Sequence, residues 1–306
     1  MPIRISRNGR AATLNAAGND CEERGDTAAA RDLYAQAARA QPNWAVPWFN
    51  LGLVHKYAGE WQASLEANLA ALEREPDHDG AVWNAGIAAT ALGQWRQARA
   101  MWRRFGIDMD DSDEPSAFAP ALTPIRVDPN GMAPEVIWAD RIDPARAVIR
   151  SVPTAASGRR YGDLLLHDGA PNGWRRLDGR EVPVFDELAV LTASDYETWE
   201  LHITQIDADQ TEALLRQLSA ADLPAEDWGG LRNLCRACSE GRPDDDAGHD
   251  HGPLEPASAD TVRIGLAMPA SAADPAWVRV RVADIPGAAL HGLTRVLPAE
   301  ALEARP

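Results

Sequence analysis

The sequence predicts an α+β protein in which an all-α repeat region of three helix pairs is followed by an α+β domain of mostly antiparallel strands. Glycines recur every 34 residues over the first third of the chain. Beyond it, the apolar pattern changes from a helical period to alternation. Residues 1–107 carry 12 basic and 11 acidic residues, whereas the rest carries 18 basic and 35 acidic ones, an asymmetry typical of a domain boundary. We expect helical repeats at 11–108, a linker at 109–134 and the α+β domain at 135–300.

Two series of glycines share the 34-residue register: Gly18, Gly52 and Gly86, and Gly25, Gly59 and Gly93. The first series lies inside helices, where the missing side chain lets a partner helix approach closely. That closeness offsets the helix-propensity cost of glycine, about 1 kcal/mol relative to alanine. The second series lies in the turns between paired helices, where glycine adopts a positive φ without strain. The pattern predicts three helix pairs that stack to bury their apolar faces.

Each unit also carries part of a signature of large and small residues: Trp48-x-x-Leu51-Gly52-x-x-His55, Ala30-x-x-x-Tyr34 and Ala98-x-x-x-Trp102. These motifs resemble the tetratricopeptide repeat (TPR), whose period is about 34 residues. The middle unit departs from the pattern at Ser64 and Asn68, and the third has Asp110 in place of the closing proline. The resemblance covers roughly residues 11–108.

The resemblance implies that the first helix of each unit lines a groove that binds a partner peptide or helix. Its groove-facing positions hold Asn15, Asn19, Phe49, Asn50, Leu53, Tyr57, Trp83, Asn84 and Ile87. Two interpretations of the aromatic side chains stay open. They form the floor of a peptide groove, or they pack against the C-terminal domain or an adjacent repeat.

Some TPR proteins clamp the C-terminal carboxylate of chaperone tails with two asparagines and three basic residues. Here Asn19 and Asn50 occupy the asparagine positions, whereas the basic positions hold Asn15, Gly80 and Asn84. Without cations a carboxylate loses its charge-assisted hydrogen bonds. The sequence therefore predicts a partner other than a chaperone tail.

Beyond the repeats, residues 108–115 are acidic and closely spaced prolines follow, which indicates a linker. We expect a last helix or the next domain, formed by residues after Asp113, to cover 98–105. Turn pairs occur at Asp168-Gly169, Asn172-Gly173 and Asp178-Gly179. Strands are predicted at 135–141, 145–152, 163–167, 198–206, 261–268 and 276–282, and helices at 186–191, 209–218 and 227–239.

One group of residues has the composition of a metal site. Cys235-x-x-Cys238 precedes His249-x-His251, and thiolates and imidazoles are the ligands that zinc prefers. The spacing departs from the common zinc pattern, and the alternative is two small core cysteines followed by an acidic loop. Zinc is the only cofactor that the residues suggest. The sequence has no nucleophile elbow, phosphate-binding loop or dinucleotide fingerprint.

The net charge of −16 disfavours nucleic acid as a partner, because an acidic chain repels phosphate. No apolar run approaches the roughly 20 residues of a membrane span, and we expect neither a secretory signal nor a membrane partner. The leading interpretation is a cytoplasmic, bacterial-type adaptor that binds another protein through its repeats, with the C-terminal domain supporting that role or binding a second partner. The alternative is a zinc protein or enzyme whose C-terminal domain carries the chemistry and whose repeats target it.

Overall fold

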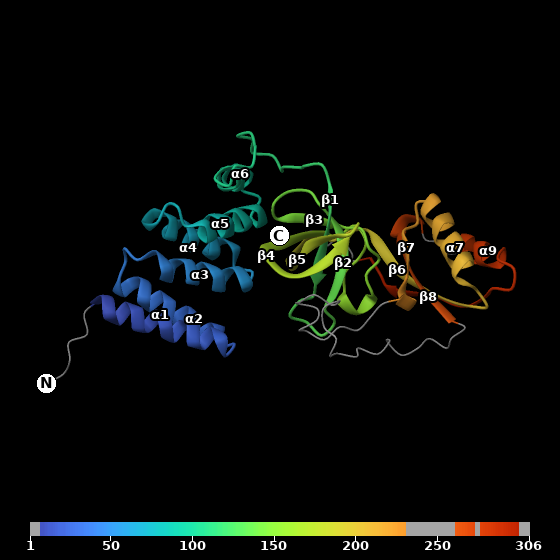
Figure 1. The fold of residues 1–306 in the computed structure, drawn as a ribbon, viewed down its shortest axis with the longest axis horizontal. Helices are drawn as coiled ribbons and strands as arrows, with labels where there is room; N and C mark the ends of the chain where they lie inside the picture. Colours follow the sequence, from blue (N-terminus) through green and yellow to red (C-terminus); the bar gives the residue numbers. More distant parts are fainter. Residues whose placement is uncertain (1–6, 231–260, 273–275, 300–306) are drawn as a thin grey trace. The chain divides into compact units, whose positions relative to one another are not determined.

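The computed structural model describes residues 7–230, 261–272 and 276–299. The chain divides into two compact units, Met1–Ala117 and Phe118–Pro306. The described part of the first unit is helical, and the second contains two β-sheets with a few helices (Figure 1). The predicted fold class is therefore confirmed.

The described residues of the first unit form six helices that follow one another as helix–turn–helix pairs (Figure 1). The pairs are α1 (Arg7–Glu23) with α2 (Thr27–Ala40), α3 (Ala45–Tyr57) with α4 (Trp61–Arg74), and α5 (Asp79–Ala91) with α6 (Trp95–Arg103).

Both glycine series have the roles that their register predicts. A Cβ atom on each first-helix glycine would overlap one side chain of the paired helix: 2.5 Å from Tyr34 at Gly18, 2.5 Å from Asn68 at Gly52, and 2.4 Å from Trp102 at Gly86. The turn glycines all have a positive φ: 77° at Gly25, 71° at Gly59 and 67° at Gly93. The paired helices therefore touch at positions where glycine has a hydrogen atom in place of a side chain.

An irregular acidic segment, rather than a further helix, packs against α6. Arg99 is nearly buried, and its Nη2 donates to the Glu114 carbonyl oxygen at 3.0 Å. The same guanidinium forms an ion pair with Asp110. The preceding residue, Met109, is buried. Residues 109–114, expected to be part of a linker, therefore belong to the first unit because the arginines of α6 bind them.

In the second unit, five strands close a barrel in the order β1-β2-β3-β4-β5, with β1 and β5 parallel and the other neighbours antiparallel. Their bounds are β1 Ala121–Val127, β2 Glu135–Arg141, β3 Arg146–Ile149, β4 Leu164–Leu177 and β5 Arg180–Thr192. A short 3₁₀ helix, Ala155–Ser157, lies between β3 and β4. The barrel core consists of Ile125, Val127, Ile137, Ala139, Ala147, Ile149, Leu165 and Phe185.

Two expectations for the barrel are wrong. Strand β1 lies inside the expected linker at 109–134. A proline has no backbone N–H to donate to a neighbouring strand, but only β2 pairs with β1 at Pro124, so the strand tolerates it. The expected helix at 186–191 is instead a continuation of β5, since closing the barrel pairs this segment with β4 and, at Asp186, with β1. The Asp178-Gly179 turn joins β4 to β5 as predicted, with φ of 48° and 75°.

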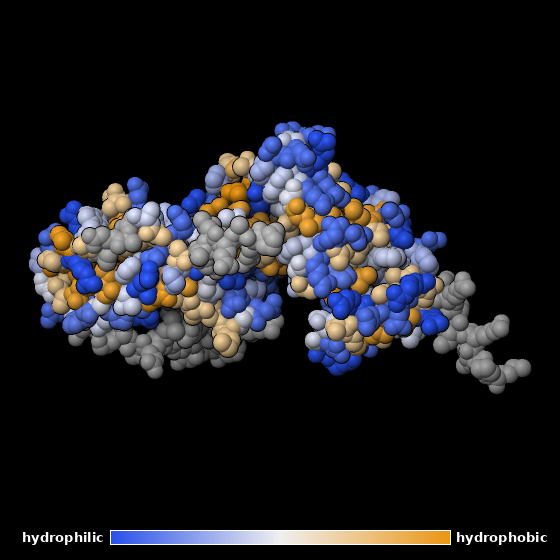
Figure 2. All heavy atoms as spheres, turned by 180° about the vertical axis from the view of Figure 1, so that it is seen from behind, coloured by the Kyte–Doolittle hydropathy of each residue, from blue (hydrophilic) through white to orange (hydrophobic). Residues whose placement is uncertain are grey.

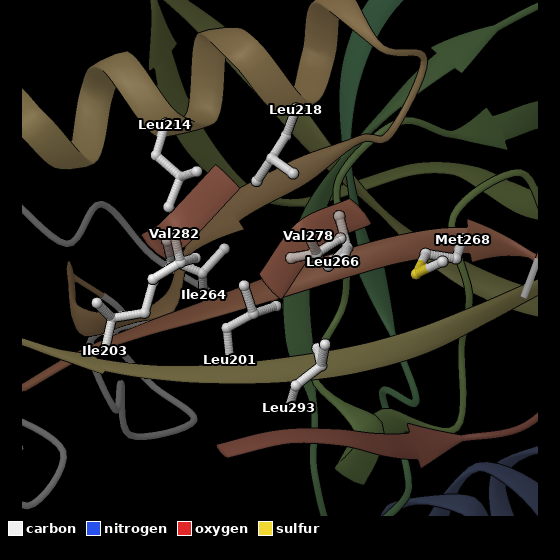
Figure 3. Close-up of a cluster of buried hydrophobic side chains, with 10 residues drawn as sticks. All are labelled: Leu201, Ile203, Leu214, Leu218, Ile264, Leu266, Met268, Val278, Val282 and Leu293. Carbon is white, nitrogen blue, oxygen red and sulfur yellow. The ribbon is translucent and has the colours of Figure 1, made fainter. Parts of the chain in front are cut away.

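The other sheet is antiparallel, with the strand order β7-β8-β6-β9. Its strands are β6 Tyr196–Thr204, β7 Ala225–Asp227, β8 Thr261–Pro269 and β9 Ala289–Leu297, and helices α7 (Ala208–Ala220) and α9 (Ala276–Ala283) pack on it. Figure 3 shows their shared core: Leu201, Ile203, Leu214, Leu218, Ile264, Leu266, Met268, Val278, Val282 and Leu293. Asp207 begins α7 with a capping box, as its carboxylate accepts from the Gln210 backbone N–H at 2.8 Å.

The expected strand at 276–282 is helix α9. Its valines alternate with arginines, a pattern that favours a strand, but Val278 and Val282 are four residues apart and so also share one face of a helix. Both are buried in the core, whereas Val280 is 57% exposed. Of the expected helix at 227–239, only the first four residues are described: Asp227 ends β7, and Trp228–Gly230 form a 3₁₀ helix.

Candidate functional site

Three asparagines connect the first helices of the first two repeats. The Asn50 amide on α3 donates to the Oδ1 atoms of Asn15 at 3.1 Å and Asn19 at 3.4 Å, both on α1. Tyr34, which fills the space beside Gly18, donates its hydroxyl to Asn19 Oδ1 at 2.8 Å. The cluster is therefore fixed by the same close helix contact that the glycines permit.

A buried lysine connects the second and third repeats in the same way. Lys56 on α3 is 2% exposed, and its Nζ donates to Asn84 Oδ1 on α5 at 3.2 Å. The ammonium group also lies 4.4 Å from the ring centroid of Tyr57. Sequence reasoning did not select Lys56, although it is the only lysine of the chain and falls on a predicted groove helix.

Two of the three groove aromatics pack within the repeat unit. The Trp83 ring centroid lies 5.0 Å from that of Trp102 and 5.0 Å from that of Phe105, both edge-on. Phe49 lies 4.4 Å from the ring of His78, the residue that caps α5. The Phe49 contact is with the adjacent repeat, the kind of contact that the packing interpretation describes, whereas the Trp83 contacts lie within the third repeat.

The predicted groove residues differ in their access to solvent. Asn15, Asn84 and Ile87 are buried, Phe49, Asn50, Leu53 and Trp83 are half-buried, and Asn19 and Tyr57 are exposed. Tyr57 is 58% exposed, unusually high for an aromatic side chain. On the side that Figure 2 draws, hydrophobic and hydrophilic residues are interspersed, so hydropathy alone does not define a site. We call the accessible groups Asn19, Asn50 and Tyr57 the first-helix face.

The sequence-predicted metal ligands Cys235, Cys238, His249 and His251 lie outside the described residues. Within the residues that are described, no group of three or more histidine, cysteine or carboxylate side chains could hold a metal ion. Nor does any helix in the described ranges have the length and apolar character needed to cross a bilayer.

No protein-family model matches the chain, and no curated protein matches it. Solved structures are similar to its first third. The second TPR of Spaghetti (RPAP3), bound to the HSP90 peptide SRMEEVD, is 18% identical, with a TM-score of 0.31 over 31% of this chain and 89% of that chain. The TPR domain of Arabidopsis OM64 is 16% identical, with a TM-score of 0.31 over 32% of this chain and 81% of that one.

Yeast Tom70 is 22% identical, with a TM-score of 0.30 over 33% of this chain and 20% of that chain. The three helix pairs, with overlap-avoiding glycines in their first helices and positive-φ glycines in their turns, have the TPR arrangement that the sequence predicts.

Proposed function

We propose that the protein is an adaptor whose first-helix face binds an extended segment of another protein. The observation that supports this most is Tyr57, whose ring is more than half exposed at the end of α3 while Lys56 lies beneath it. A side chain with a large apolar ring and a hydroxyl contributes strongly to protein interfaces.

Asn19 and Asn50 supply the polar part of the proposed interface. Each carries an amide that can donate to and accept from the backbone of an extended peptide. Their mutual hydrogen bond fixes both side chains before a ligand arrives, which lowers the entropic cost of binding. The partner we expect presents an apolar side chain to Tyr57 and backbone amides to the two asparagines.

A chaperone carboxylate tail does not fit this face. At one of the three basic positions of such a clamp, Gly80 has no side chain, and a Cβ atom there would lie 2.9 Å from Phe49. The other two hold Asn15 and Asn84, which are buried and hydrogen-bonded within the repeats. We therefore expect the peptide SRMEEVD to bind at least about tenfold more weakly than a peptide chosen for this protein.

Selection of peptides from a random library on the immobilised full chain tests the proposal. Selected peptides should lose about tenfold or more in affinity for Tyr57→Ala, because truncating an interface tyrosine removes a major contact. They should keep native affinity for Gln62→Ala, a matched change at an exposed position of α4. If selection yields no binder, or if both variants bind equally well, the first-helix face is not the binding site.

A further inference from the structure

The C-terminal unit contains a pocket of about 410 Å³ that the proposed adaptor role does not use. One side comes from the residues around β3 and β4, and the other from β6, α7 and β7. The lining residues are Arg150, Val152, Tyr161, Tyr196, Ser219, Asp222, Pro224, Ala225 and Glu226. We call it the tyrosine pocket. Its volume falls within the usual range for a small-molecule site.

Two tyrosines form the aromatic part of the lining. The rings of Tyr161 and Tyr196 have centroids 5.0 Å apart and meet at 67°, an edge-to-face arrangement. Both pack against a buried cluster of Val152, Trp228 and Ala267. The rings are therefore held by the core on one side and line the pocket on the other.

The charge of the lining is predominantly negative. Glu226 and Asp222 both line the pocket, and Arg150 is the only basic side chain among the described residues of the lining. The Arg150 Nε donates to Asp140 Oδ2 at 2.6 Å, so a carboxylate already balances this guanidinium. The same guanidinium lies over the Tyr161 ring, 5.9 Å from its centroid, and its Nη1 donates to the Tyr161 hydroxyl at 3.4 Å. An anionic ligand would meet two carboxyl groups, whereas a cation would meet two acids and the ring of Tyr196.

Glu226 has the properties of a carboxyl group that lacks a counter-ion. Burial raises its pKa to about 7, although hydrogen bonds from the Ser151 side chain and the Val152 backbone lower it and the nearby Glu135 raises it further. Among the described residues, no basic side chain contributes to that balance. A cation in the pocket would stabilise the ionised form and favour release of its proton near neutral pH.

We propose that the tyrosine pocket binds a small organic ammonium ion, with the cationic group directed toward Glu226 and Asp222 and the organic part against Tyr161 and Tyr196. An ion pair to a partly desolvated carboxylate and packing of the organic group against aromatic side chains are the interactions that recognise such ligands in proteins. The ligand class follows from charge and shape and is independent of the partner that the repeats bind.

Three probes of similar size separate the possible ligand classes: benzylammonium, benzyl alcohol and benzoate. Their affinities for the full chain are measured by ligand-observed NMR near neutral pH. Benzylammonium should bind at least about tenfold more tightly than the neutral and anionic probes. Tighter binding of benzoate would indicate an anion site at Arg150 and overturn the proposal, as would equal affinities or no binding of any probe.

Two glutamine variants locate the interaction. Glu226→Gln keeps the shape of the side chain and should weaken benzylammonium binding about tenfold. Glu212→Gln changes an exposed carboxylate of α7 that does not line the pocket, and it should alter the affinity by less than about threefold. Equal losses of benzylammonium affinity in the two variants would mean that the negative charge of the whole unit attracts the cation, rather than a site at Glu226. This result too would overturn the proposal. Thermal unfolding of each variant verifies that it is folded.

The pH dependence gives an independent readout. Arg150, Tyr161, Tyr196, Asp222 and Glu135 are the other titratable groups around Glu226. Because the ionised form of Glu226 pairs with the cation, benzylammonium affinity should rise about fivefold from about pH 6 to about pH 8 in the native chain. That rise should be lost in Glu226→Gln, and a rise that persists in the variant would contradict the assignment.

Discussion

Gly86 and Trp102 show how a single residue determines the helix pairing of the repeats. A Cβ atom at Gly86 would lie 2.4 Å from the six-membered ring of Trp102, a separation that atoms do not tolerate. Trp102 is 1% exposed and packs against Trp83, so it has little freedom to move away. The absence of a side chain at position 86 is therefore a packing requirement of the third repeat.

We predict that Gly86→Ala lowers the free energy of unfolding by about 1–3 kcal/mol, the usual cost of overpacking, despite the better helix propensity of alanine. In a Trp102→Phe background the ring is shorter, and the added cost of Gly86→Ala should be smaller. Denaturant unfolding of the four chains in this double-mutant cycle measures the difference. Equal costs in both backgrounds would show that Trp102 is not the obstacle.

His167 lies on β4 in the barrel and is fully buried. Burial lowers its pKa to about 4, and although Nδ1 donates to the Asp168 carbonyl oxygen at 2.7 Å, Arg141 opposes the charged form. The unfolded chain, with a histidine pKa of about 6.5, therefore binds a proton that the folded chain rejects. The stability contributed by the neutral ring is complete above about pH 6.5 and is lost as the pH falls toward 4.

The predicted loss over that range is up to about 3 kcal/mol from this one residue. In His167→Asn the amide can still donate to the Asp168 carbonyl group, and the slope of unfolding free energy against pH should become shallower. His202→Gln, at a partly exposed histidine of β6, serves as the control and should keep the native slope. The slope, rather than absolute stability, is the readout, so a general destabilisation cannot imitate the effect.

At the scale of elements, the acidic segment after α6 packs where a last helix or the next domain was expected to cover the third repeat. Arg99 holds this segment through Nη2 and Nε, which donate to the Glu114 carbonyl oxygen at 3.0 and 3.3 Å, and through its ion pair with Asp110. A segment with few apolar residues is thereby fixed by charge-assisted hydrogen bonds rather than by a hydrophobic face.

We expect Arg99→Met to destabilise the first unit by about 1–3 kcal/mol, since it removes both donors to the Glu114 carbonyl oxygen and the ion pair with Asp110. Hydrogen exchange of residues 109–116 should accelerate more than that of the helices. Arg96→Met, which changes an exposed arginine of the same helix, should leave exchange of the segment unchanged. Unaltered exchange in Arg99→Met would show that other contacts hold the segment.

Sequence patterns predicted those elements whose local signal agrees with their packing. The 34-residue glycine register identified all three helix pairs, and alternation identified β2, β6 and β8. The pattern failed where packing alone decides between two structures, as at Val278 and Val282, whose spacing suits both a strand and a helix. It also failed at 186–191, where barrel closure imposes a strand.

The two proposed sites, the first-helix face and the tyrosine pocket, differ in whether a local sequence pattern marks their residues. Repeat register led to Asn19, Asn50 and Tyr57, because equivalent positions in each repeat face the same way. The tyrosine pocket could not be predicted, since its lining comes from segments as distant in sequence as Arg150 and Glu226, and only the folded second unit brings them together.

At the scale of the whole molecule, the metal prediction for Cys235, Cys238, His249 and His251 calls for a direct measurement. Elemental analysis of the purified full chain should find about one zinc ion per chain if these side chains form a tetrahedral site. The Cys235→Ser/Cys238→Ser double variant should then lose it. No zinc in the native chain would favour the alternative in which the cysteines pack in a core.

The central claim is that another protein binds across the first-helix face, and photo-crosslinking tests it most directly. A photoreactive phenylalanine derivative is placed at Tyr57 in one full-length chain and at Gln62, on α4, in another. A library-selected peptide should crosslink efficiently at position 57 and hardly at all at position 62. Efficient crosslinking at position 62 with none at position 57 would contradict the account and place the binding surface on the second helices of the repeats.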